Sequence, residues 1–222
     1  RILCNRIRPT LEAAQSVEQA GFRSGYSCDD HLLTVSLVIE ACTEFNMPLW
    51  LCAIDFKKAF DSVEHSSLWS SLRAQGIDEN YVCILRLLYQ GQCGRISGKG
   101  AISKPFAIQR GTKQGDPMSP ILFNSVLLSI FDKLQSRWRG RGWGIEVEGS
   151  HNKRLLSLCF ADDVLLLAST RKQLKIMLEE LIEEARKTGL ELHTGKTKAM
   201  NNDPESQGGT LKLKSGSVEL LA

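Results

Sequence analysis

The sequence has no long hydrophobic run, and its cysteines form no C-x-x-C pair. No apolar stretch reaches the roughly 18 residues that a membrane-spanning helix requires. The first residues, Arg-Ile-Leu-Cys-Asn-Arg, also lack the apolar segment of a secretory signal. We therefore expect an intracellular protein with no membrane association.

The seven cysteines are odd in number and scattered, which argues against a disulfide framework and against a zinc site. Cys52 and Cys159 lie inside apolar runs, where a reduced thiol packs as a small hydrophobic side chain. The four histidines have no partner at the spacing of metal ligands. These absences favour a reducing compartment.

What the sequence does contain is the composition of an ordinary folded protein, with 42% hydrophobic and 24% charged residues among 222. A chain of this length can bury one sizeable core. The formal net charge of +3 permits a polyanionic partner without requiring one. We expect one folded domain or a fragment of one.

Helical periodicity and end signals predict several helices. Ser27 is placed to cap the first, which we expect to be mostly buried. Ser119 is placed to cap another, with Pro120 in its first turn. Gly76 and Gly189 are placed as C-terminal stops. The predicted helices cover residues 27–45, 63–75, 79–90, 119–134 and 171–188.

Short apolar or alternating runs predict strands. The run 49–56 is typical of a buried strand that ends at Asp55. The runs 155–160 and 164–168 flank Ala161-Asp162-Asp163, the layout of a hairpin with two carboxylates at its tip. Further strands are expected within 94–111, 190–193 and 211–221, with a loop over 201–209. This mixture indicates an α+β fold in which helices cover an antiparallel sheet.

Asp55, Asp162 and Asp163 are the candidate catalytic residues. Hard divalent cations such as Mg²⁺ bind oxygen ligands, and a two-metal phosphoryl-transfer site needs carboxylates on rigid elements such as strand ends. Each residue has an ordinary alternative: a solvated turn for Asp162 and Asp163, and a strand end that meets solvent for Asp55. Only the combination favours chemistry.

Five motifs follow one another along residues 19–200. They are Gln19-Ala-Gly-Phe-Arg23-Ser-Gly-Tyr-Ser, Ala53-Ile-Asp55-Phe-Lys-Lys-Ala-Phe60-Asp61-Ser-Val, Arg110-Gly-Thr-Lys-Gln114-Gly115-Asp-Pro-Met-Ser-Pro-Ile-Leu-Phe-Asn124, Phe160-Ala-Asp162-Asp163 and Gly189-Leu-Glu-Leu-His-Thr-Gly-Lys196-Thr-Lys-Ala-Met. In this order they resemble the reverse transcriptases of non-LTR retrotransposons.

The resemblance implies an RNA-directed DNA polymerase core with a palm-type, ferredoxin-like sheet and part of a helical fingers region. Asp55 and Asp162 would be direct ligands of two Mg²⁺ ions, or of Mn²⁺, with Asp163 as their companion. Phe60 would be a steric gate that occupies the space of a ribose 2′-hydroxyl. Its alternative role is core packing beside Ala59.

The resemblance also implies substrate-binding roles for further residues. Gln114 and Gly115 would contact nucleotide and template, the glycine by permitting close backbone approach. Lys196 would lie near the triphosphate and protonate the leaving pyrophosphate as a general acid. Arg23 would touch template or nucleotide. The alternatives are an ordinary loop residue for Gln114, a solvated lysine for Lys196 and a structural brace for Arg23.

By the same resemblance, residues 1–48 would belong to the fingers, 49–200 to the palm with inserted fingers elements, and 201–222 to the segment leading toward the thumb. Arg6 and Arg8 do not match the family's basic fingers motif. The partners would be an RNA template, a DNA primer and a dNTP, with the nucleus as the site of action. The full polyprotein would carry flanking segments, a thumb and an endonuclease, that we do not find in this sequence.

Two other classes of protein stay open. A decayed retroelement remnant would bind nucleic acid in a salt-dependent manner without chemistry. Another palm-type enzyme, such as a nucleotide cyclase, would share the metal-binding carboxylates. The motif around Gln114 and Gly115 argues against the second of these.

Overall fold

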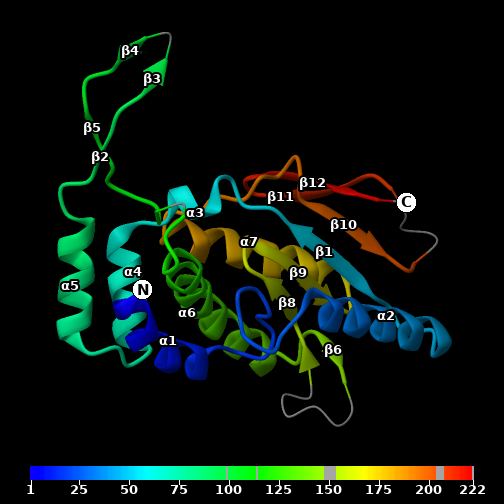
Figure 1. The fold of residues 1–222 in the computed structure, drawn as a ribbon. Helices are drawn as coiled ribbons and strands as arrows, with labels where there is room; N and C mark the ends of the chain where they lie inside the picture. The colour runs from blue at the N-terminus through cyan, green and yellow to red at the C-terminus, as the bar shows by residue number, and fades with distance from the viewer. Residues whose placement is uncertain (99, 114, 148–153, 204–207, 222) are drawn as a thin grey trace.

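A six-stranded sheet forms the centre of the protein, with the strand order β11-β12-β10-β1-β9-β8. It is seen in a computed structural model that describes residues 1–98, 100–113, 115–147, 154–203 and 208–221. Figure 1 shows the sheet among its helices. The strands are β1 (Trp50–Ile54), β8 (Ser157–Phe160), β9 (Asp163–Ala168), β10 (Lys198–Asn201), β11 (Thr210–Leu213) and β12 (Gly216–Leu220).

The pairing of the strands confirms the predicted α+β fold but changes the character of the sheet. All neighbours in this sheet are antiparallel except β10 and β12, which run parallel. The sheet is therefore mixed, although the predicted antiparallel pairing holds for all its neighbours but one. Strand β10 was not predicted as a strand; it pairs with β1 on the side opposite β9.

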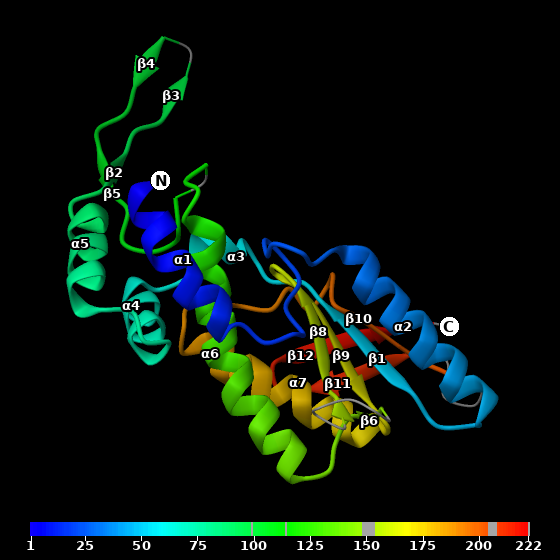
Figure 2. The same ribbon diagram turned by 60° about the horizontal axis from the view of Figure 1, so that its bottom comes forward.

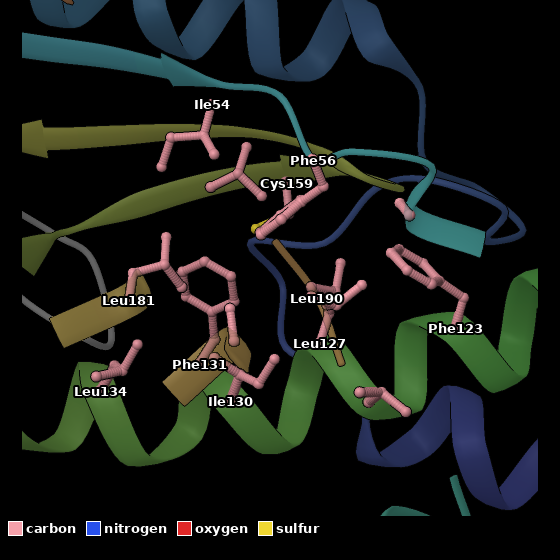
Figure 3. Packing of buried hydrophobic residues seen from close by; sticks show 14 of the residues in the cluster. Ile54, Phe56, Phe123, Leu127, Ile130, Phe131, Leu134, Cys159, Leu181 and Leu190 are labelled. Atoms are coloured by element: carbon pink, nitrogen blue, oxygen red, sulfur yellow. The ribbon is translucent and has the colours of Figure 1, made fainter. Parts of the chain in front are cut away.

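One face of the sheet is covered by α6 (Ser119–Gly140) and α7 (Arg171–Arg186). Alternation along β1 turns Trp50, Cys52 and Ile54 toward this face, where they join the larger of two buried clusters. Figure 3 shows Ile54 near Leu181 of α7, with the side chains of α6 below them. Each such large apolar side chain contributes roughly 1.5–3 kcal/mol when it is fully buried.

The start of α6 differs from the prediction. Met118, and not Ser119, is the residue that precedes the helix, and it makes no side-chain capping bond. The Ser119 hydroxyl instead donates to the carbonyl of Lys113, which ties the helix to the preceding loop. Pro120 lies in the first turn as predicted, where its missing N–H costs no helical hydrogen bond.

The opposite face of the sheet carries α2 (Cys28–Glu44), as Figure 2 shows. Ser27 and Asp30 form the capping box that the sequence predicts. The expectation that this helix is mostly buried was wrong: Leu33 is 62% and Leu37 55% exposed. Only Val38 and Cys42 of this helix are buried, in the smaller cluster against this face of the sheet.

The remaining described elements lie mostly beside the sheet. Helices α1 (Ile2–Ala14), α3 (Ala59–Ser62), α4 (His65–Ala74) and α5 (Glu79–Tyr89) accompany α6. A narrow ribbon of β2 (Cys93–Gly94), β3 (Ser97–Gly98), β4 (Ala101–Ile102) and β5 (Phe106–Ala107) stands away from them in Figure 1. A last pair is β6 (Ile145–Glu146) with β7 (Arg154–Leu155).

The strand predicted over 190–193 is reduced to one isolated bridge between Leu192 and Phe56. The seven cysteines are all free thiols. Within the described ranges, no helix combines the length and the apolar character needed to cross a membrane.

Candidate active site

The predicted hairpin and the predicted strand lie side by side and bring their carboxylates to one end of the sheet. β1 and β9 are antiparallel neighbours, with Ile54 opposite Val164. The adjoining residues, Asp55 and Asp163, continue this register past the end of β1. Phe160 pairs with Asp163 across β8 and β9, which leaves Ala161 and Asp162 as a two-residue tip.

The electrostatics show that the three carboxylates influence one another. Partial burial raises the pKa of Asp163 above its ordinary value, and the negative charges of Asp162 and Asp55 raise this pKa further. A positive charge faces the group, because Lys196 Nζ lies 3.7 Å from Asp55 Oδ2. The Lys196 side chain is 65% exposed, so this ion pair is open to solvent.

The chemistry of this donor set suits a hard divalent cation, because Asp55, Asp162 and Asp163 offer carboxylate oxygens from the ends of adjacent strands. Among the described residues, no group of three or more His, Cys, Asp or Glu side chains already has the arrangement of a metal site. Neighbouring carboxylates repel one another unless positive charge lies between them. The residues thus fit a cation that would draw them together.

A cleft of about 510 Å³ opens beside Asp55. Basic side chains from three segments of the chain reach it: Lys57 and Lys58 after β1, Arg110 before α6, and Lys196. Lys57, which lines the cleft, is paired with Glu191 at 2.6 Å. The rest of the lining is Phe56, Ser62, Gly189 and His193.

The segment after α7 fixes the backbone around Asp55. The N–H of His193 donates to the Asp55 carbonyl at 2.8 Å, and the N–H of Lys57 donates to the Glu191 carbonyl at 2.8 Å. The buried hydroxyl of Thr197 accepts a longer bond of 3.4 Å from the Asp55 N–H. The Asp55 backbone is therefore held on both its N–H and its carbonyl.

Phe60 lies in α3, which follows the loop after Asp55, and its ring is only partly buried. The ring stacks on Phe123 of α6 at a centroid distance of 4.4 Å, and the edge contact with Phe22 spans 6.3 Å. One part of the ring thus packs on the core while another stays accessible. Both roles considered for Phe60, packing and gating, are compatible with this position.

The chain before α6 braces α3. The N–H of Thr112 donates to the Phe60 carbonyl at 2.7 Å, and the N–H of Gly111 donates to the Val63 carbonyl at 2.7 Å. Gly111 has φ +87°, and a Cβ added there would stand 2.7 Å from the Asp61 carbonyl oxygen. This close approach requires glycine.

Of the other predicted substrate-binding residues, Gly115 and Arg23 do not line the cleft beside Asp55. Gly115 is exposed at φ +83° in the loop before α6, and a Cβ there would meet nothing within 4 Å. Gln114 lies outside the described residues. Arg23 donates to the carbonyls of Ser16 and Gln19, and its guanidinium stacks 4.1 Å over the Tyr26 ring. The structure thus uses Arg23 to brace its own loop.

The sequence did not identify Gln19, Gly21 and Asn124 as part of the site, yet all three support the tip that carries Asp162. The Gln19 side chain bonds to both the N–H and the carbonyl of Ala161. Asn124 donates to the carbonyl of Gly21, which lies against the same turn. Gln19 and Asn124 lie within quoted motifs, but no periodic pattern marks their contacts with residues more than 100 positions away.

The sequence of the chain matches a family described as reverse transcriptase (RNA-dependent DNA polymerase) over residues 1–221. It is 32% identical over 224 aligned residues to the Pol polyprotein of the type-2 retrotransposable element R2DM of Drosophila melanogaster, covering 99% of this chain. It is 34% identical to the Pol polyprotein of a type-1 element R2 of Popillia japonica, over 89% of this chain. The chain spans 20% and 27% of these two relatives.

Solved structures give the same fold. A telomerase of Candida tropicalis, in complex with a fragment of telomeric RNA, superposes with a TM-score of 0.70 at 14% identity, covering 92% of this chain and 34% of that one. A telomerase of Candida albicans, also with telomeric RNA, gives a TM-score of 0.67 at 13% identity, covering 98% and 37%. These similarities concern the arrangement of helices and strands.

Proposed function

This chain belongs to the reverse transcriptase family, and from that premise we propose that it is the polymerase core of a non-LTR retrotransposon protein. The reaction would be transfer of a nucleotide from a dNTP to the 3′-hydroxyl of a DNA primer paired with an RNA template. The observation that carries the proposal is the convergence of Asp55, Asp162 and Asp163 at the end of paired strands β1 and β9. The family match over residues 1–221 supports it.

Members of the family use divalent metal ions, and we propose that Asp55 and Asp162 hold two Mg²⁺ ions, with Asp163 as the supporting carboxylate. Bound there, such ions would lower the pKa of the attacking hydroxyl and stabilise the charge of the leaving pyrophosphate. The protein itself contributes the fixed positions of these carboxylates. The β1–β9 ladder fixes two strand ends, and the bonds to His193 and Thr197 fix the backbone of Asp55.

Lys196 and Phe60 would act on the incoming nucleotide. The Lys196 ammonium, 3.7 Å from Asp55 Oδ2, has a proton at Nζ that it can donate to the leaving pyrophosphate. The Phe60 ring, supported from behind by Phe123, would occupy the space of a 2′-hydroxyl and so favour deoxynucleotides. Lys58 and Arg110 add positive charge to the same cleft, where a triphosphate would bind favourably.

We propose the same division of the chain as the motifs indicate, with fingers over 1–48, palm over 49–200 and a thumb-directed segment over 201–222. Gly115 and Gln114 would meet template and nucleotide ahead of α6. The whole polyprotein would supply a thumb and an endonuclease. Because an element of this kind is copied at a chromosomal site, the nucleus would be the place of action.

The proposal is tested by primer extension with the full-length protein that carries this chain. The reaction contains a DNA primer annealed to an RNA template, dNTPs and Mg²⁺. We expect extension by the wild type and none by Asp55→Asn, which keeps the shape of the side chain but removes its charge. Glu183→Gln removes one charge from the exposed surface of α7 and should extend normally.

Two outcomes would overturn the proposal. Extension by Asp55→Asn at the wild-type rate would remove Asp55 from the active site. Salt-dependent binding of the primer-template by the folded wild type, with no extension, would indicate a remnant that only holds nucleic acid.

A further inference from the structure

Gln19 is a buried glutamine whose amide bonds to the turn that carries Asp162. Gln19 is only 6% exposed. Gln19 Oε1 accepts from the N–H of Ala161 at 2.9 Å and from the N–H of Gly21 at 2.8 Å. Gln19 Nε2 donates to the Ala161 carbonyl at 3.3 Å. One side chain thus satisfies both backbone groups of Ala161.

The turn needs such support because its backbone is unfavourable. Ala161 has φ +57°, in the left-handed region that a residue with a side chain rarely adopts. Such a conformation persists where surrounding contacts over-determine it. Ala161 is also 5% exposed, so its N–H and carbonyl cannot rely on water.

The segment that presents Gln19 is itself anchored on both sides. The N–H of Cys159 donates to the Glu18 carbonyl at 2.7 Å, and the N–H of Ala20 donates to the Cys159 carbonyl at 2.9 Å, so the segment follows the edge of β8. Gly21 lies so close to the turn that a Cβ would stand 2.1 Å from the Ala161 nitrogen. Asn124 of α6 donates to the Gly21 carbonyl at 2.8 Å.

We infer that Gln19 is a positioning residue, which fixes the Ala161-Asp162 turn, and with it the direction of the Asp162 carboxylate, before substrate binds. The inference rests on the proposed function, because it gives Asp162 a catalytic use. A carboxylate at a hairpin tip moves with its turn, and small misplacements of a reacting group reduce the rate steeply. Gln19 would therefore affect the chemical step while touching no substrate.

A glutamine elsewhere in the protein provides a matched control. Gln135 of α6 is 5% exposed, donates from Nε2 to the Ser157 hydroxyl at 3.0 Å and accepts at Oε1 from the Arg139 guanidinium at 2.8 Å. Ser157 begins the same strand, β8, whose other end leads into the turn. Gln19→Met and Gln135→Met therefore each remove a buried amide bonded to the β8–β9 hairpin, but only the first lies at the catalytic end.

The experiment compares Gln19→Met, Gln135→Met and Asp162→Asn in the full-length protein that carries this chain. Steady-state extension on an RNA template gives kcat and the KM for the dNTP, and kcat is expressed per folded molecule by means of the folded fraction from thermal melts. We expect Gln19→Met to lower kcat roughly 10- to 100-fold with KM nearly unchanged. Gln135→Met should lose comparable stability yet keep its kcat per folded molecule.

Amide hydrogen exchange without divalent cations gives a second readout. In the wild type the Ala161 N–H should exchange as slowly as the N–H groups of β8, although it lies at a hairpin tip. Gln19→Met should speed the exchange of Ala161, whereas Gln135→Met should leave it protected. Fast exchange at Ala161 in the wild type would overturn the inference even if Gln19→Met does not fold.

The kinetic outcomes separate this inference from the proposed function. If Asp162→Asn is inactive but Gln19→Met keeps the wild-type kcat per folded molecule, the positioning role is wrong and the proposed function stands. Equal losses of kcat per folded molecule in both glutamine variants would also refute it, because they would show that loss of any buried amide on the β8–β9 hairpin slows the reaction. Full activity of Asp162→Asn would overturn the proposed function, and the inference with it.

Discussion

Asp163 gives the clearest electrostatic signal at the scale of single residues. Its pKa is raised by partial burial and by the charges of Asp162 and Asp55. Ionisation of Asp163 is thus less favourable in the folded protein than in the unfolded chain. The stability linked to its protonated form is fully present below the ordinary pKa of 3.8 and is lost as the pH rises through the higher folded pKa.

We therefore predict that Asp163→Asn raises the melting temperature at pH 7 in the absence of divalent cations, because the amide removes an unfavourable charge. The advantage over the wild type should shrink as the pH falls and vanish below 3.8, where the wild-type carboxyl is protonated. Thermal melts from pH 3 to 8 measure this, with Glu183→Gln as the control for loss of one surface charge. A variant less stable than the wild type at pH 7 would contradict it.

Phe60 offers a test of substrate selection by one side chain. Phe60→Val keeps a hydrophobic residue in α3 but removes the ring between Phe22 and Phe123. We predict that it raises incorporation of ribonucleotides relative to deoxynucleotides at least roughly tenfold, since space for a hydroxyl becomes available. Phe131→Val removes a ring from the same core without facing the cleft. An equal change of selectivity in both variants would assign the effect to loosened packing.

Among the structural elements, the short helix α3 is held in place by the segment that precedes α6. The segment 110–112 donates two backbone hydrogen bonds to α3 and the residue after it, and Gly111 makes the closest approach. A side chain at Gly111 would therefore push α3, and with it Phe60, away from its place. The position of the Phe60 ring is therefore set by both α3 and the segment 110–112.

Gly111→Ala should destabilise the protein by about 1–3 kcal/mol for the backbone conformation alone, and further through its clash with Asp61. Gly91→Ala is the matched control, because Gly91 also has positive φ, +70°, but open space around its Cβ. Urea unfolding of both variants isolates the clash as the difference between them. Equal destabilisation of the two variants would show that the backbone at Asp61 moves aside for the new Cβ without lowering the free energy of unfolding.

How far the sequence predicted these elements depends on how local their signals are. The β8–β9 hairpin and α7 were predicted closely, because alternation, helical spacing and a terminating glycine lie within each segment. The burial of α2 was overestimated, because apolar residues in a helix are buried only where another part of the protein covers them. Strand β10 was missed because its four residues become a strand only by pairing with β1 and β12.

At the scale of the whole molecule, the site is assembled from segments far apart in sequence. Asp55, the hairpin tip and Lys196 are brought together by one sheet, and Gln19 and Asn124 reach the tip from outside it. The motifs predicted the first group as candidates. The supporting residues could not be predicted, because hydrogen bonds to a turn leave no pattern in the sequence.

The catalytic use of the hairpin tip is measured most directly by the single-turnover rate of the first nucleotide addition by Asp162→Asn in the full-length protein that carries this chain. With an RNA template, a DNA primer, Mg²⁺ and saturating dNTP, we predict a rate at least about a thousandfold below the wild type, or roughly 4 kcal/mol of lost transition-state stabilisation. Glu183→Gln should match the wild type. An Asp162→Asn rate within about tenfold of the wild type, or less than 1.4 kcal/mol, would contradict the assignment of the hairpin tip as the catalytic centre.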